Sequence, residues 1–426
     1  MEQFTQWILT DREPSLGVTE PGAIAFGAAT ARQYVTGAVT SVSVAMTSGL
    51  YKNSFTCGIP NTTETGSQFS AALGVLAGKP EKGLLALEDI TEADVAAAEE
   101  WIAAGKVTVT LSEITSHLKL EVTVTAATET ATVTIEGSHT NITSIVVNGE
   151  TVLSKEAGES VSPAEEAEQA VTHHTLSEFL RYCDTVPFAE IAPLKEGYGM
   201  NLALAQAALE SDRAVLSKGF VQMNGGHVFS ANVLETAQVL TAAALEARVI
   251  GLGRPAMSIT GSGAHGIICT MPLYAIFKCH RLTPEQLCRA TALSYLVTMY
   301  LKGFAGRLSA YCGCGIAAGT GMAAALTYLM GGDQEQIECT ISNMACGITG
   351  MICDGGNTGC VLKATVAVDA AYRSAKLGMN RLRIGAEHGI NGATIEETMQ
   401  NMGRIADPGM RETERTIVEL LEKKRT

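Results

Sequence analysis

Apolar residues recur with a helical period along most of the chain. GAIAFGAATARQYV (22–35) follows this pattern, and TEADVAAAEEWIAA (91–104) adds an N-terminal capping signature and a glycine stop at Gly105. From about residue 165 onward, alanine-rich stretches of the same kind are separated by glycine-rich loops at 224–226, 251–266, 303–306, 312–321 and 354–359. The pattern predicts a mainly helical protein.

Between these regions the apolar period changes from 3.6 to 2. The segments KVTVTLSEI, LKLEVTVTA, TATVTIEGS and TSIVVNGETV are rich in β-branched residues and alternate in polarity, and the last contains an Asn-Gly hairpin signal. One helix followed by about four antiparallel strands predicts a small α+β module. We therefore expect a mainly α body, residues 1–81 and 160–426, with an inserted α+β domain at 82–159.

Composition and charge narrow the possible partners and location. Aromatic residues are only 5% of the 426 positions, and the 43 glycines favour close helix packing around small side chains. The net charge of −14 argues against nucleic acid as a partner. The first residues, MEQFTQWILTDREPS, lack a basic-then-apolar signal pattern, so we expect a cytoplasmic protein.

The uncharged stretch at 308–332 is a candidate membrane-spanning segment. It contains small residues at membrane-helix spacing, but it is mostly Gly, Ala, Ser and Thr, which insert weakly. A buried helix explains it better than a membrane carrier, and we expect no membrane association.

Nine of the eleven cysteines fall into two groups. In a chain without an export signal they are expected to be thiols or metal ligands rather than a disulfide framework. Several lie in helical apolar patterns and are expected to be structural: Cys183, Cys269, Cys279, Cys288 and Cys339. Glycine instead surrounds Cys312 and Cys314 in YCGCGIAAGTG, and Cys353 and Cys360 in MICDGGNTGC. From the residues alone, buried thiols and a metal or iron–sulfur site both remain open for this second group.

The second group also carries a family resemblance. YCGCGIAAGTG and MICDGGNTGCVLK resemble the cluster motifs of the iron–sulfur L-cysteine desulfidase and L-serine dehydratase alpha-chain family. LGVTEPGAIAFGAA, SGLYKNSFTCGIP and ITGSGAHGI resemble other motifs of that family, and TIEETMQNMGRIADPGMRETERTIVELL is similar to its tail. The motifs occur in the family's order, which implies a serine dehydratase alpha-chain-like body.

The resemblance implies a [4Fe–4S] cluster held by three cysteines. Cys353 and Cys360 correspond directly to two ligands; for the first we favour Cys312, with Cys314 as the alternative. The open iron would act as a Lewis acid in β-elimination, giving a 2-oxo acid and ammonia, plus sulfide from cysteine. No pyridoxal phosphate is expected.

The chain departs from the family at one informative position. Val18 stands where the family has a cysteine that accepts a proton in the desulfidase reaction, which leaves the general base open. Cys57 is a conceivable substitute. We assign candidate catalytic roles to His265, Glu20 and Lys52, and candidate substrate contacts to Thr19, Asn53, Ser262 and Gly263.

Two functions of different classes follow. The first is an iron–sulfur lyase acting on L-cysteine, L-serine or a related small β-substituted acid, expected to be a homodimer. The alternative is a non-catalytic or repurposed cluster protein, binding or sensing a ligand, that lost its base with Val18.

Overall fold

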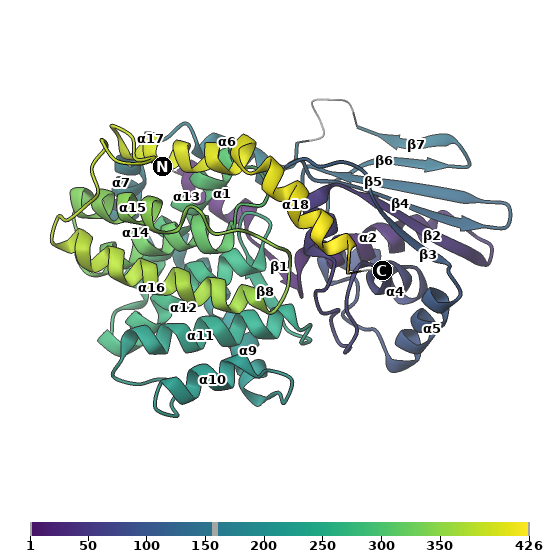
Figure 1. Ribbon diagram of the computed structural model, residues 1–426, viewed down its shortest axis with the longest axis horizontal. Helices are drawn as coiled ribbons and strands as arrows, with labels where there is room; N and C mark the ends of the chain where they lie inside the picture. Colours follow the sequence, from purple (N-terminus) through teal and green to yellow (C-terminus); the bar gives the residue numbers. More distant parts are fainter. Residues whose placement is uncertain (1, 156–160, 425–426) are drawn as a thin grey trace.

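The computed structural model describes residues 2–155 and 161–424. Figure 1 shows two units side by side, a helical body and a smaller unit built on one sheet. The helical body consists of α1 (Glu2–Asp11), α6 (Pro163–Val171), α7 (Leu176–Thr185), α8 (Phe188–Ile191), η2 (Ala192–Leu194), α9 (Lys195–Glu210), α10 (Leu216–Met223), α11 (Val233–Val249), α12 (Gly263–His280), α13 (Pro284–Ala305), η3 (Cys314–Ala318), α14 (Gly319–Leu329), α15 (Gln334–Ile348), α16 (Gly359–Met379) and α17 (Ile395–Arg404).

The second unit, called the sheet unit, spans residues 19–154. Its elements are α2 (Thr19–Gln33), β2 (Val39–Met46), α3 (Ser48–Asn53), α4 (Ser67–Ala77), η1 (Pro80–Leu85), α5 (Glu92–Ala103), β3 (Val107–Leu111), β4 (Lys119–Ala126), β5 (Thr130–Glu136), β6 (Ile142–Val147) and β7 (Glu150–Ser154). Four further elements connect the units: β1 (Glu13–Leu16) pairs with β8 (Pro255–Ser258), and η4 (Ile405–Gly409) leads into α18 (Arg411–Glu422).

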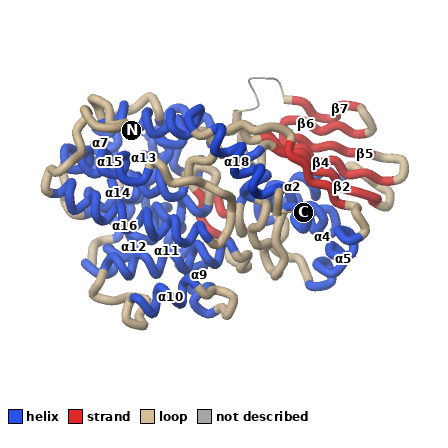
Figure 2. The backbone as a smooth tube through the Cα atoms, viewed as in Figure 1, coloured by secondary structure: helices blue, strands red, loops and turns tan. Residues whose placement is uncertain are grey.

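The strand order of the sheet is β3-β2-β4-β5-β6-β7. β2 runs parallel to β3 and antiparallel to β4, and the remaining neighbours are antiparallel. The alternation expected from the sequence is present, because Leu120, Val122 and Val124 of β4 are fully buried while the residues between them are partly exposed. Figure 2 shows helices covering one face of this sheet.

The expected domain boundary at residue 82 does not match this packing. β2 lies between β3 and β4, so the sheet cannot be assembled from residues 82–159 alone. Val42, Val44 and Met46 of β2 are buried in the same core as β4, which the sequence reading of residues 1–81 as helix and loop missed. The structure therefore assigns residues 19–77 to the sheet unit.

Small side chains allow the helices of the sheet unit to approach closely. α2 is buried on all sides over most of its length, and it packs against α4. A Cβ atom at Gly74 of α4 would come within 2.6 Å of the Ala25 carbonyl oxygen, so only glycine fits at this crossing. This explains the glycine and alanine content of α2 and α4.

The uncharged stretch 308–332 lies inside the helical body. It forms a loop, the short η3 turn and α14, and nearly every residue of η3 and α14 is buried by neighbouring helices. Within residues 2–155 and 161–424, no helix has both the length and the apolar character needed to cross a bilayer.

Candidate functional site

Two short backbone contacts bring the two cysteine segments together. The Cys312 N–H donates to the Met351 carbonyl at 3.1 Å, and the Cys353 N–H donates to the Ala310 carbonyl at 2.6 Å. Tyr311 and Ile352 form an antiparallel bridge between them. Cys312 and Cys353, forty-one positions apart in sequence, therefore lie on neighbouring strands of backbone, as the glycine-rich motifs suggested.

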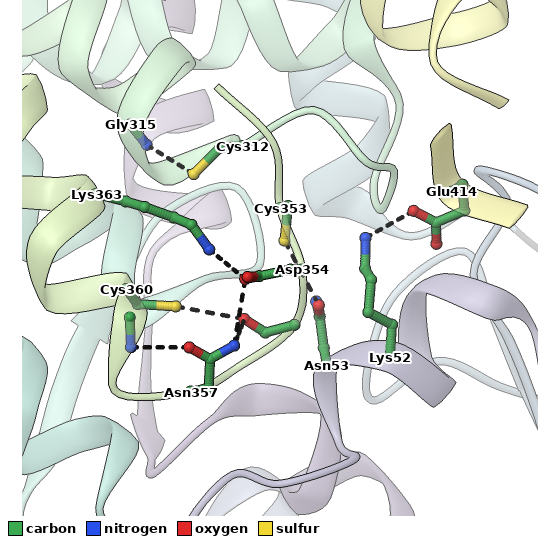
Figure 3. Close-up of polar contacts among 12 residues, drawn as sticks. Lys52, Asn53, Cys312, Gly315, Cys353, Asp354, Asn357, Cys360, Lys363 and Glu414 are labelled. Atoms are coloured by element: carbon green, nitrogen blue, oxygen red, sulfur yellow. Dashed lines mark hydrogen bonds and ion pairs between the residues drawn. The ribbon is translucent and has the colours of Figure 1, made fainter. Parts of the chain in front are cut away.

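Local turns place the other two thiols nearby. Cys314 begins η3, directly before α14, and Cys360 lies in the first turn of α16. The Cys360 thiol donates to the Gly355 carbonyl at 3.4 Å, so the loop between Cys353 and Cys360 folds back on itself. Figure 3 shows Cys312, Cys353 and Cys360 around the ion pair of Lys363 with Asp354.

Glycine is needed for this close approach of backbone segments. A Cβ atom at Gly315 would lie 2.2 Å from the Met351 sulfur, and one at Gly355 would lie 2.6 Å from the Lys52 carbonyl oxygen. Gly355 also has a φ of +112°, a conformation that other residues rarely adopt. The glycines of both cysteine motifs therefore have a packing role that is independent of any ligand.

The four thiols differ in how readily they ionise. A hydrogen bond from Cys314 and another from the Gly315 N–H, at 3.4 Å, outweigh burial and lower the pKa of Cys312 to about 7. The same interaction with Cys312, together with burial, raises the pKa of Cys314 well above its ordinary value. Burial raises the pKa of Cys353, and burial with the neighbouring Cys353 raises that of Cys360 to about 12. Of this pair, Cys312 is therefore the thiol that ionises more readily.

Lysines lie beside these thiols. Cys353 and Cys312, together with Glu414, raise the pKa of Lys52 despite its burial. Asp354, followed by Cys360 and Cys353, raises the pKa of Lys363 despite its burial. Positive charge next to several thiols favours their anionic form, which is the form that binds metals.

A small cavity lies next to the cysteine segments, between the helical body and the sheet unit. Its volume is about 60 Å³, which is room for a few water molecules at roughly 10–15 Å³ for each probe-sized site. Six of the residues singled out from the sequence line it: Glu20, Asn53, Ser262, His265, Cys353 and Cys314, the alternative cluster ligand. Four residues that were not singled out also line it: His139, Lys302, Arg307 and Tyr311.

Glu20 supplies a permanent negative charge to this cavity. The Asn53 amide donates to its carboxylate at 2.7 Å, and His139 Nε2 lies 3.8 Å away. Burial raises the pKa of Glu20, but His139 and Asn53 outweigh it and lower the pKa to about 2. Such a carboxylate is a weak base, so its chemistry favours holding a cation over accepting a proton. Asn53 also accepts a hydrogen bond from the Cys353 thiol at 3.7 Å, as Figure 3 shows.

His265 is a buried, neutral imidazole that also lines the cavity. It belongs to the first turn of α12, and its Nδ1 lies 2.6 Å from the Thr260 hydroxyl. Burial, with the nearby positive charge of Lys302, lowers the pKa of His265 well below its ordinary value. Its Nε2 faces the first cysteine segment, because a Cβ atom at Gly313 would lie 2.7 Å from it.

Lys302 and Arg307 add positive charge to the same cavity. Lys302, in the last turn of α13, donates to the carbonyls of Gly306 and Arg307 at 2.5 and 2.9 Å. Burial lowers the pKa of Lys302 to about 8. Arg307 Nη1 lies 2.9 Å from a carboxylate oxygen of Glu168, and both side chains are buried. The cavity is therefore polar and carries both signs of charge.

Three predicted site residues lie behind the cavity wall. Lys52 is fully buried and binds Glu414 at 2.7 Å and the Ser309 carbonyl at 2.9 Å. The Thr19 hydroxyl accepts a hydrogen bond from Arg248 at 3.0 Å. Gly263 packs so closely that a Cβ atom there would lie 2.7 Å from Arg248 Nε. These positions support the site rather than line it.

Val18 and Cys57 are both buried in the core. Val18 is the N-cap of α2, and a Cβ atom at Gly356 would lie 2.9 Å from its side chain. The position of the missing family cysteine is thus directly beside the loop between Cys353 and Cys360. Burial, with the negative charge of Glu20, raises the pKa of Cys57, which makes it a poor thiolate.

Sequence reasoning missed His139, Lys302 and Arg307 for different reasons. His139 comes from the turn between β5 and β6, in a segment read only for its strand pattern. Lys302 and Arg307 flank the glycine loop that precedes the first cysteine motif. Two positive charges directly before the uncharged stretch 308–332 were the sequence signal that could have identified them as site residues.

Comparison with known proteins decides the family. The family model described as serine dehydratase alpha chain matches residues 81–419, about four fifths of the chain. The chain belongs to the serine dehydratase alpha chain family. The resemblance read from the cysteine motifs is confirmed. Val18, Glu20 and Asn53 precede the matched segment, whereas His139, the other sheet-unit residue of the cavity wall, lies within it.

Relatives of nearly full length extend the similarity to the whole chain. A UPF0597 protein of Clostridium botulinum is 39% identical over 412 residues, which is 96% of this chain and 95% of that protein. A UPF0597 protein of Caldanaerobacter subterraneus is 38% identical, and one of Clostridioides difficile 34%, each over 96% of both chains. The sequence similarity to these relatives therefore extends into the N-terminal segment that precedes residues 81–419.

As the side chains stand in residues 2–155 and 161–424, no group of three His, Cys, Asp or Glu residues is close enough to hold a metal ion. A four-iron cluster is larger than one ion, and its thiolate ligands bind different iron atoms. The chemistry of the donor set, four thiols beside lysines in glycine-rich loops, fits such a cluster.

Proposed function

We propose that this protein is a [4Fe–4S]-dependent lyase that eliminates the β-substituent of a small α-amino acid, giving a 2-oxo acid and ammonia. L-cysteine and L-serine are the proposed substrates. The observation that carries the proposal is the small polar cavity with Cys353 and Cys314 in its wall. Membership of the serine dehydratase alpha chain family supports a lyase of this type.

Cys312, Cys353 and Cys360 are the proposed cluster ligands. Cys312 is favoured over Cys314 because its thiol ionises more readily. Three ligands leave one iron free, and when bound the cluster supplies a Lewis acid that polarises the leaving hydroxyl or thiol. Lys52 and Lys363 would balance the negative charge of the thiolates.

The chain's own residues account for binding and proton transfer. Glu20, ionised and held by Asn53, binds the substrate ammonium group. His265, neutral because its pKa is lowered, is the proposed acceptor of the Cα proton through Nε2, while Thr260 orients the ring. The β-substituent leaves with its electron pair, and water converts the resulting enamine to a 2-oxo acid and ammonia.

One observation favours a second function. Val18 is apolar, buried and beside Gly356, where the family's proton-accepting cysteine would stand. A protein without that base would retain its cluster and cavity but bind its ligand without turning it over. The alternative is therefore a cluster-containing relative that binds or senses a small ligand.

The test is anaerobic purification followed by assays of ammonia and pyruvate with L-cysteine and L-serine. We expect a brown protein with broad absorbance near about 400 nm. Cys353→Ser or Cys360→Ser should remove this absorbance and most of the iron, and Cys312→Ser should do so where Cys314→Ser does not. Cys183→Ser, in a buried helix, is the matched control. Unchanged iron in Cys353→Ser and Cys360→Ser would reject the cluster, and an intact cluster without ammonia release would favour the alternative.

A further inference from the structure

Three residues of the cavity wall carry buried polar atoms that make no hydrogen bond within the described residues, although His139 also lies near the Glu20 carboxylate. Within residues 2–155 and 161–424, Arg307 Nε and Nη2, the Tyr311 hydroxyl and His139 Nε2 are buried without a hydrogen bond. All three residues line the same cavity. Buried polar groups are rarely left unpaired, and a cluster of them around one cavity indicates a ligand that completes their hydrogen bonds.

The unpaired groups are mostly donors. A guanidinium has five N–H donors and no acceptor, and a tyrosine hydroxyl donates readily. Only Arg307 Nη1 is engaged, by Glu168 at 2.9 Å, and the Arg307 side chain is 8% exposed. A ligand group that satisfies donors of this kind accepts several hydrogen bonds and carries negative charge. A carboxylate meets both requirements, because Arg pairs with it through parallel hydrogen bonds.

Contacts with Lys302 and Gly261 position Arg307 beside His139, which lies near the Glu20 carboxylate. Lys302 donates to the Arg307 carbonyl at 2.9 Å, which fixes the turn after α13. A Cβ atom at Gly261 would lie 3.0 Å from Arg307 Nη1 and 3.4 Å from His139 Nδ1, so glycine lets both side chains share one wall. His139 in turn lies 3.8 Å from Glu20. The cavity thus holds a guanidinium on one side and an ionised carboxylate on another.

We propose that Arg307, with the Tyr311 hydroxyl, binds the substrate α-carboxylate, and that this cavity selects zwitterionic α-amino acids. The inference rests on the proposed function only in taking the cavity as the substrate site. It doesn't depend on elimination. Lys302 acts as a positioning residue, since its donors are used by the Gly306 and Arg307 carbonyls. The small volume of about 60 Å³ restricts the side chain to a few atoms.

The test measures binding by isothermal titration calorimetry of the holoprotein with L-alanine, which has no β-leaving group and cannot be eliminated. L-alaninamide, in which an amide replaces the carboxylate, is the comparison. We expect L-alanine to bind and L-alaninamide to bind at least about tenfold more weakly, the range for loss of a charge-assisted hydrogen bond. Equal binding of both, or no binding of L-alanine, would overturn the inference.

Three variants locate the effect. Arg307→Lys keeps the charge but not the planar fork, and Tyr311→Phe removes a hydroxyl that has no protein partner, so its fold should be unaffected. Both variants should weaken L-alanine binding. We expect a loss of about 10–100-fold for Arg307→Lys and a smaller loss for Tyr311→Phe. Arg373→Lys, on the exposed side of α16, is the control and should bind normally. If Tyr311→Phe and a folded Arg307→Lys both bind L-alanine as wild type does, the assignment is wrong.

These outcomes separate the inference from the lyase proposal. If the protein binds L-alanine through Arg307 but releases no ammonia from L-cysteine or L-serine, the inference holds and the lyase proposal is rejected. If wild type and Arg307→Lys release ammonia equally fast at unchanged KM, the lyase proposal holds and the inference is rejected.

Discussion

At the scale of single residues, Val18 distinguishes this chain from the family motif. It caps α2 at its N-terminal end and is almost completely buried beside Gly356. A thiol at a helix N-terminus has a lowered pKa, and more of it is then present as the thiolate that can accept a proton. Valine cannot accept a proton, so the site depends on another proton acceptor. His265 is the proposed one, because its Nε2 faces the first cysteine segment.

Val18→Cys should therefore increase turnover. Cysteine is slightly smaller than valine, so folding should tolerate the change, and a restored base contributes roughly 10²–10⁴-fold. Pyruvate and ammonia release from L-cysteine is the measurement, and Val18→Ala, which changes size without adding a thiol, is the control. If wild type already turns over rapidly and Val18→Cys adds nothing, His265→Gln should instead abolish activity.

At the scale of elements, the C-terminal helix α18 is tied to α3 by one buried ion pair. Lys52 of α3 and Glu414 of α18 lie 2.7 Å apart and are 0% and 4% exposed. Val418 of α18 also enters the core of the sheet unit. Figure 1 shows α18 running from the helical body toward the sheet unit. This helix therefore links the helical body to the sheet unit.

Lys52→Met should destabilise the protein strongly, because it leaves Glu414 buried and unpaired. Breaking a buried pair in this way costs about 3–5 kcal/mol, while replacing both partners with apolar residues is often neutral. Urea denaturation should show a lowered midpoint for Lys52→Met and recovery in Lys52→Met/Glu414→Leu. Equal loss in the single and double variants would mean that the ion pair itself, rather than an unpaired charge, determines stability.

Elements also differ in how well the sequence predicted them. The strands β3 to β7 were visible because polar and apolar residues alternate regularly in them, and the capping signature at Thr91 is confirmed by its hydrogen bond from the Asp94 N–H. β2 was missed although Val42, Val44 and Met46 alternate in the same way. It follows a helix in a region of mixed pattern, and its pairing partners are distant in sequence.

At the scale of the whole molecule, the position of β2 decides which fragments can fold. Residues 82–159 contain β3 and β4 but lack the strand between them, and they also lack α2 and α4, which cover the sheet. We expect this fragment to show no cooperative unfolding by circular dichroism. A fragment of residues 19–155 retains all six strands and should unfold cooperatively. Cooperative folding of 82–159 alone would restore the boundary predicted from the sequence.

The sequence by itself determined the local features of this protein. Helical and strand periods, turn glycines and the two cysteine motifs depend on residues near one another in the chain, and these motifs also indicated the family. Glu20, Asn53, Ser262 and His265 were assigned site roles because they lie in recognised motifs; the structure places them around one cavity, and their roles stay predictions.

Only the tertiary structure decided the remaining features. It paired β2 with β3 and β4, brought His139 from the sheet unit to Arg307 of the helical body, and moved Lys52 behind the wall to Glu414. These contacts join residues that are far apart in sequence, and burial rather than local pattern determines their partners and charge. The physical reason is that hydrophobic packing of two separate cores fixes where their polar surfaces meet, and the cavity lies at that meeting.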